Sequence, residues 1–201
     1  FGSQALTDAV QARLDDTLGA DAPTVKLAMS YGNPNLAAVL EELRARGMRR
    51  LLVVPLYPQY SGSTTASVFD AVSRQLQRWR WIPELRFVTE YYREPGYVQA
   101  LAASVREHWQ AHGRSERLLL SFHGIPGRYL VNGDPYYCQC QVTARLLRET
   151  LGLGEQELHV SFQSRVGREP WLQPYTDQTL VAWARSGVRR VDVMCPGFAI
   201  D

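Results

Sequence analysis

Sequence patterning predicts a parallel α/β fold, and three observations lead to it. Short apolar runs alternate along the chain with longer segments in which apolar residues recur at helical spacing. The apolar runs are too short for buried helices, and turn residues such as Gly, Pro and Asn separate many of them from the helical segments. Strands that alternate with helices form β–α–β units, so we expect parallel sheets flanked by helices.

The first predicted element is an amphipathic helix, because its apolar residues recur three or four positions apart, at 5, 6, 10, 14 and 18. Residues 25–31 follow as a short apolar strand. Asn33-Pro34-Asn35 then provides turn and capping chemistry for a helix over residues 36–46, which Gly47 ends.

The same alternation continues along the chain. Residues 50–57 are predicted as a buried strand, and a polar loop leads from it into a helix over about 65–79. The later elements are strand 85–91, helix 97–112, strand 118–122, helix 136–151, strand 158–162, helix 177–185 and strand 188–194. Glu94-Pro95-Gly96 is the best candidate for a boundary, so we predict two halves, residues 1–93 and 94–201.

Composition excludes several classes of protein. The chain has 201 residues, of which 45% are hydrophobic and 21% charged, as in ordinary globular proteins. A formal net charge of +2 is too small for a nucleic-acid-binding surface, so we expect no nucleic-acid partner. Three cysteines favour a reducing compartment, the cytoplasm, over a disulfide framework. The apolar runs are too short to cross a bilayer, whereas peripheral membrane contact stays open.

The two ends suggest a piece of a longer protein. The chain opens on Phe-Gly-Ser-Gln, without a methionine or a signal sequence. It stops at Asp201, just after a predicted strand. We therefore expect segments before Phe1 and after Asp201.

Distinctive residues follow the predicted strands. In open parallel sheets, ligands bind outside the carboxyl ends of the strands. The loops at these ends are 31–34, 58–65, 123–126, 163–172 and 195–198, and they hold one histidine and several aromatic residues. The hydroxyl-rich segment 61–65 suits either an anion or the capping of the next helix. No phosphate-binding glycine motif occurs, so nucleotide cofactors are not supported.

Position alone leaves two interpretations of His123 open. It ends an apolar strand and precedes Gly124, so its ring is either hydrogen-bonded to a loop or serves as a general base or metal ligand. The sequence has no G-x-S-x-G nucleophile elbow, which argues against Ser-His-acid hydrolysis. The remaining candidates are more typical of structural roles: His108 and His112, His159, and Cys138-x-Cys140.

Taken together, the loop strings resemble the signatures of the ferrochelatase family, in the same order. The strings are Leu56-Tyr-Pro-Gln-Tyr-Ser-Gly-Ser-Thr-Thr65, Ser121-Phe-His-Gly-Ile-Pro126, Gly133-Asp-Pro-Tyr136, Phe162-Gln-Ser-Arg-Val-Gly-Arg-Glu-Pro-Trp-Leu172 and Cys195-Pro-Gly-Phe198. The resemblance implies two Rossmann-like, chelatase-like halves with an active-site cleft between them. It also implies insertion of Fe²⁺ into protoporphyrin IX, so that the porphyrin and ferrous iron are the expected partners.

The resemblance assigns roles residue by residue. His123 falls on the family's catalytic, metal-binding and proton-accepting histidine. Tyr57 and Trp171 match aromatic residues that line the macrocycle pocket, Tyr31 matches a pocket tyrosine, and Phe198 matches an aromatic residue beside the catalytic centre. The matched strings add three residues to the predicted porphyrin pocket, namely Ser61, Gln163 and Ser164.

Three departures from the family pattern change what is expected. Ser30 stands where many relatives carry arginine, which puts one polar contact of the pocket in doubt. Gly62 stands where relatives with an iron–sulphur cluster can carry cysteine, so we expect no such cluster and no permanently bound cofactor. The family's catalytic glutamate is expected about one helical turn after Asp201, so residues 1–201 alone should not catalyse insertion.

Two alternatives remain. The first is a related chelatase that acts on another tetrapyrrole or on cobalt, although the strings after residues 56 and 162 favour ferrochelatase. The second is a porphyrin or haem carrier without catalytic activity. Turnover and metal specificity separate the three.

Overall fold

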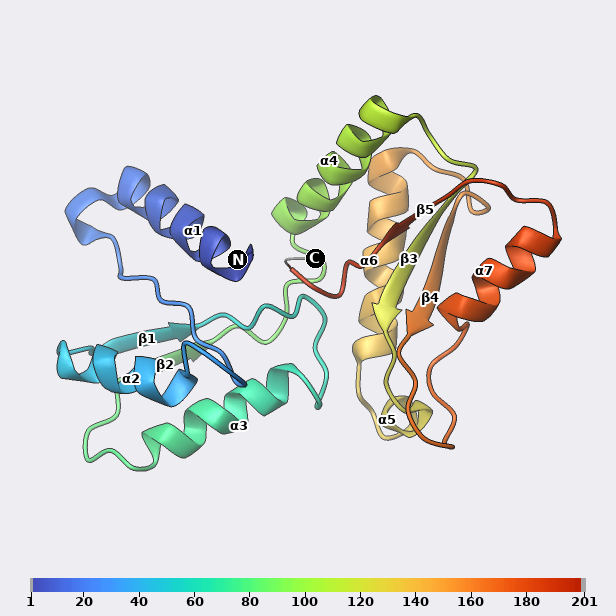
Figure 1. The fold of residues 1–201 in the computed structure, drawn as a ribbon. Coiled ribbons are helices and arrows are strands. Elements are labelled where there is room, and N and C mark those ends of the chain that lie inside the picture. Colours follow the sequence, from blue (N-terminus) through green and yellow to red (C-terminus); the bar gives the residue numbers. More distant parts are fainter. Residues whose placement is uncertain (1, 200–201) are drawn as a thin grey trace. The chain divides into compact units, whose positions relative to one another are not determined.

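A computed structural model describes residues 2–199, and in this range helices and strands alternate largely as predicted (Figure 1). The elements are α1 (Gly2–Leu18), η1 (Gly19–Asp21), α2 (Leu36–Ala45), β1 (Arg50–Val53), α3 (Thr65–Leu76), β2 (Glu84–Phe87), α4 (Pro95–His112), β3 (Arg117–His123), α5 (Gly127–Val131), α6 (Tyr136–Leu151), β4 (Leu158–Gln163), α7 (Thr176–Arg185) and β5 (Val191–Met194). Asp201, after which we expect the catalytic glutamate, lies outside the described residues. No helix within residues 2–199 is long and apolar enough to span a bilayer.

All the strand ladders within residues 2–199 are parallel, which confirms the predicted α/β class. β1 pairs with β2, from Arg50 opposite Glu84 to Val53 opposite Phe87. β3 lies between β4 and β5 and pairs with both. Because β3 is the central strand, five of its residues, Leu118 to Phe122, are buried on both faces of the sheet.

The described chain divides into two compact units. The first comprises residues up to 56 together with 63–89, and the second comprises 57–62 together with 90–199. Residues 57–62 follow β1 in sequence but belong to the second unit. The predicted halves, 1–93 and 94–201, stay a prediction about the domains of the protein.

In the first unit, α2 and α3 pack over the β1–β2 sheet. The buried helix residues Leu36, Leu40, Val72 and Leu76 form one cluster with Trp79, which follows α3, and with the partly buried strand residues Leu51, Val53 and Leu85. The predicted cap of α2 is confirmed, since Asn35 Oδ1 accepts hydrogen bonds from the amides of Ala37 and Ala38 at 3.0 and 3.3 Å.

The strand predicted over residues 25–31 is wrong. This segment joins no ladder, and its only regular feature is an isolated bridge between Met29 and Asn35. An apolar run becomes a strand only where a neighbouring strand takes up its N–H and C=O groups, and β1 pairs with β2 alone among the described residues. The strands at β1, β2 and β5 are also shorter than predicted, for the same reason.

The second unit has a three-layer arrangement. α4 and α6 cover one face of the β4–β3–β5 sheet, and α7 lies on the other face (Figure 1). At the start of α7, the Thr176 hydroxyl lies 2.8 Å from the hydroxyls of both Ser121 and Ser161, on neighbouring strands. The layers leave the carboxyl ends of the three strands at a common edge, where the predicted loops begin.

Candidate active site at the carboxyl ends of the second sheet

Side chains from three strand ends meet at this edge. His123 is the last residue of β3, and its partner in the ladder is Gln163, the last residue of β4. Gln163 Nε2 donates a hydrogen bond to Sγ of Cys195, which follows β5, at 3.7 Å. Parallel pairing therefore places the predicted residues His123 and Gln163 side by side.

His123, the last residue of β3, is exposed, whereas the five residues before it are buried. The Phe198 ring stands edge-on to the His123 ring, with centroids 6.1 Å apart and an interplanar angle of 81°. Partial desolvation lowers the pKa of His123 below its ordinary value of 6.5, so the ring is neutral at pH 7. Neither ring nitrogen has a hydrogen-bond partner among residues 2–199. The alternative in which a hydrogen bond to a loop holds the His123 ring is therefore not seen.

Gly124 allows two loops to approach closely behind His123. Its amide donates to the Gln163 carbonyl oxygen at 2.6 Å. A Cβ at this position would lie 2.8 Å from that oxygen and 3.2 Å from Cε3 of Trp171. Only glycine fits here without displacing backbone, so the His-Gly sequence reflects packing as well as chemistry.

The loop after β4 folds back onto the loop after β3. Ser164, directly after Gln163, has a φ of 62°, a left-handed conformation that is rare for residues other than glycine. Further along, the Trp171 indole donates to the Val166 carbonyl at 2.9 Å, and the Leu172 amide donates to the carbonyl oxygen of Ile125 at 3.0 Å. The structure thus holds Gln163, Ser164 and Trp171 near the His123 loop.

Segment 57–62 is tied to the second unit by two polar side chains. Asp134 accepts hydrogen bonds from the Ser61 hydroxyl at 2.9 Å and from the Gly62 amide at 2.8 Å. Gln139 Oε1 accepts one from the Tyr60 amide at 2.7 Å. The Ser61 side chain is buried, and Asp134 takes its hydroxyl hydrogen bond. Sequence reasoning gave Asp134 no role, although the Gly133-Asp-Pro-Tyr136 string contained the signal.

Tyr31 is the one predicted site residue in the first unit. It lies between the bridged residues Met29 and Asn35, and the residue is 86% exposed. Its assignment to the porphyrin pocket stays a prediction.

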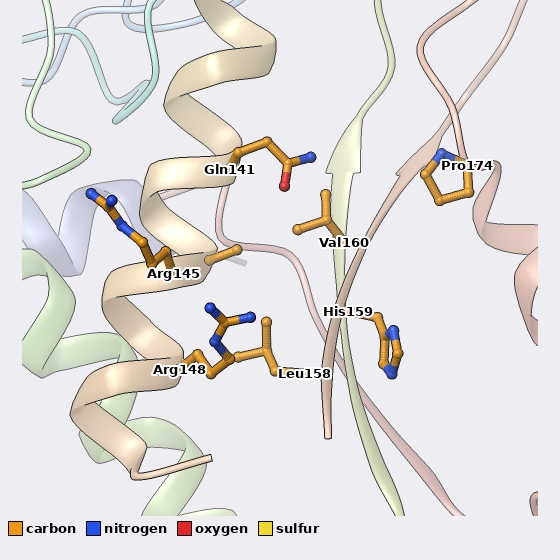
Figure 2. Close-up of a pocket in the computed structure, with 8 residues that line it drawn as sticks. Gln141, Arg145, Arg148, Leu158, His159, Val160 and Pro174 are labelled. Carbon is orange, nitrogen blue, oxygen red and sulfur yellow. The ribbon is translucent and has the colours of Figure 1, made fainter. Parts of the chain in front are cut away.

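A separate groove of about 380 Å³ lies between α6 and β4, and none of the predicted site residues lines it (Figure 2). Gln141, Arg145 and Arg148 line it from α6, with Leu158 and Val160 from β4. His159 points away from α6 in Figure 2, because its ring packs against Trp183 with centroids 4.9 Å apart. This contact agrees with a structural role for His159.

Other metal-binding candidates remain weak. His108 and His112 stack with centroids 4.5 Å apart, and His108 Nε2 lies 3.4 Å from an oxygen of Asp192. Among residues 2–199, no three His, Cys, Asp or Glu side chains form a group that could hold a metal ion.

A sequence model of the family described as Ferrochelatase matches residues 2–201. Ferrochelatase of Azoarcus sp. (strain BH72) is 62% identical over 177 residues, which cover 88% of this chain and 49% of that protein. Ferrochelatase of Nitrosococcus oceani is 60% identical over 177 residues, covering 88% of this chain and 48% of the relative. That of Idiomarina loihiensis is 53% identical over 201 residues, covering 100% and 55%. The chain therefore spans about half the length of the curated relatives it matches.

A solved structure, SirB from Bacillus subtilis with Fe³⁺, has a similar fold. The TM-score is 0.63 at 13% identity, and the match covers 96% of this chain and 71% of SirB. At this identity the likeness concerns the fold alone.

Proposed function

This chain belongs to the ferrochelatase family, and on that premise we propose that the protein inserts Fe²⁺ into protoporphyrin IX, giving protohaem and two protons. The observation that carries the proposal is His123. Its ring is neutral at pH 7 and free of other hydrogen bonds among residues 2–199, and it lies where three parallel strands end.

The reaction makes two demands that a neutral histidine can meet. A free-base porphyrin carries two pyrrole N–H protons, which must leave before four nitrogens can bind the metal. A neutral imidazole has one nitrogen lone pair, which accepts a proton or binds a divalent ion. Since one lone pair cannot do both at once, a second acceptor is required, and we propose the glutamate expected after Asp201.

We propose that the aromatic residues Tyr31, Tyr57, Trp171 and Phe198 contact the apolar macrocycle by stacking and edge contacts. Gln163 pairs with His123 in the ladder and Ser164 directly follows Gln163, and we assign both residues to the same pocket. Ser61 contributes through the loop that its bond to Asp134 holds in place. Distortion of the ring by these walls would direct its nitrogen lone pairs towards the metal.

The test is turnover by the full-length protein with protoporphyrin IX and Fe²⁺ under anaerobic conditions. Many turnovers per protein molecule are expected. Tight porphyrin binding without turnover would identify a carrier. Faster insertion of cobalt, or insertion only into a different tetrapyrrole, would identify the related chelatase.

The protein should purify without an iron–sulphur cluster. We infer this because glycine at position 62 has no thiolate, and because the three cysteines within this chain, at 138, 140 and 195, are fewer than the four ligands of a cluster. The measurement is acid-labile sulfide together with the visible spectrum of the anaerobically purified full-length protein. About one sulfide or more per chain, with a brown cluster spectrum, would contradict the prediction. We also propose that no other cofactor is permanently bound and that iron is only a substrate.

We propose a cytoplasmic location, with no nucleic-acid partner. The small net charge supports the absence of a nucleic-acid partner, and the three free cysteines support the cytoplasmic location.

A further inference from the structure

The loop Cys195–Phe198 rests on buried polar side chains from distant parts of the second unit. The Tyr97 hydroxyl, on α4, donates a hydrogen bond to the Pro196 carbonyl oxygen. Gln59 Nε2 in turn donates to the Tyr97 oxygen at 3.5 Å and to the Thr143 hydroxyl at 3.0 Å. Gln59, which is 1% exposed, thus links the loop after β1 to the loop after β5.

The loop also packs against the polar layer, by which we mean the side chains of Gln59, Tyr97 and Thr143. Pro196 is buried. A Cβ at Gly197 would lie 3.4 Å from the Tyr136 hydroxyl and 3.8 Å from Gln59 Oε1. The loop backbone therefore packs closely against these polar groups. The next residue is Phe198, whose ring contacts His123. The orientation of the Phe198 ring therefore depends on where this loop is fixed.

The chemistry of Tyr97 and Gln59 is better suited to fixing the position of the loop than to stabilising the fold. Burial raises the pKa of Tyr97 well above its ordinary value, so the phenol stays protonated and remains a donor. Gln59 Oε1 is buried and has no hydrogen-bond partner in the described part of the chain, which costs free energy. An apolar side chain of similar size would avoid that cost. The amide therefore contributes orientation, because its Nε2 group fixes the phenol.

We propose that Tyr97 and Gln59 are positioning residues of the active site. Tyr97 fixes the Pro196 carbonyl, Gln59 fixes the Tyr97 phenol, and together they set the Phe198 ring against His123. The functional part of this inference rests on the proposed function, in which His123 accepts a proton or binds iron. The structural part does not.

The first test measures the ring contact directly. In the full-length protein, selectively labelled on His and Phe, the nuclear Overhauser effect between the His123 and Phe198 rings is compared for Tyr97→Phe and wild type. The Overhauser effect between the two rings should be at least severalfold weaker in Tyr97→Phe, because the Pro196 carbonyl loses its hydrogen-bond donor. Tyr91→Phe is the matched control: its ring stands edge-on to Tyr97 with centroids 5.7 Å apart, but its hydroxyl makes no hydrogen bond among residues 2–199. An unchanged Overhauser effect in Tyr97→Phe overturns the proposal.

The second test is kinetic. Tyr97→Phe should lower kcat about tenfold, because small misplacements of reacting groups cost rate, and leave the KM for protoporphyrin within about twofold. In the Phe198→Ala background the same change should have no further effect, since Tyr97 acts through Phe198. Effects that multiply in the double variant would show that Tyr97 acts by another route. Absence of chelatase activity in wild type would refute the proposed function while leaving the ring-contact test intact.

Gln59→Met provides a second variant for both tests if Tyr97→Phe does not fold. It keeps the phenol and removes only the amide that orients it. We expect a thermal midpoint at or above that of wild type, together with a weakened ring contact and a lower kcat. A fall in the midpoint with an unchanged ring contact would show that Gln59 is merely structural.

Discussion

Replacing His123 with alanine should slow iron insertion by the full-length protein at least about a hundredfold, while leaving the fold intact. The substitution removes the imidazole lone pair at the end of β3, and no other histidine lies in the matched loops. The measurement is the steady-state rate with protoporphyrin IX and Fe²⁺, with circular dichroism to verify folding.

His112→Ala is the matched control, because this histidine lies at the exposed end of α4 and its ring contacts His108 on the same helix. Its rate should stay within about twofold of wild type. A His123→Ala rate within tenfold of wild type, a change in barrier below about 1.4 kcal/mol, would remove His123 from the catalytic role.

The second large effect concerns stability. Gly124→Ala should lower the free energy of unfolding by about 2–4 kcal/mol, because the new Cβ would lie 2.8 Å from the backbone oxygen of Gln163 and 3.2 Å from Trp171. Backbone on one side and a ring on the other leave little room to shift. The loss should appear in urea unfolding curves as a lower midpoint with an unchanged slope.

Gly96→Ala provides the control for this substitution. Gly96 lies in the first turn of α4, and nothing lies within 4 Å of a Cβ built there. Alanine should therefore be neutral or stabilise by up to about 1 kcal/mol, through its higher helix propensity. If Gly124→Ala unfolds within about 0.5 kcal/mol of wild type, the loops behind His123 do not approach as closely as described.

Several features of the fold are local, and the sequence predicts them well. The sequence predicts a helix over residues 136–151, and α6 has these bounds; its end is local because Gly152 adopts the left-handed conformation that stops the helix. The Asn35 cap is equally local, since donor and acceptor lie two and three residues apart. The apolar run before His123 was sufficient to place this residue at a strand end.

Other features depend on residues that meet only after folding. Residues 25–31 are as apolar as the true strands, but a strand needs a partner, and composition does not provide one. The short helix α5 was also not predicted.

The residues that hold the loops of the candidate site in place also depend on contacts formed only after folding. In the sequence, Gln59 and Asp134 appear as polar loop residues. Yet Gln59 hydrogen-bonds Thr143, 84 positions away, and Asp134 hydrogen-bonds Ser61, 73 positions away. Motif order and apolar patterning are enough to identify the family, the parallel α/β class and the position of His123 at a strand end. Which polar side chains are buried and hold the loops beside His123 is visible only in the folded chain, because burial depends on packing between segments far apart in the sequence.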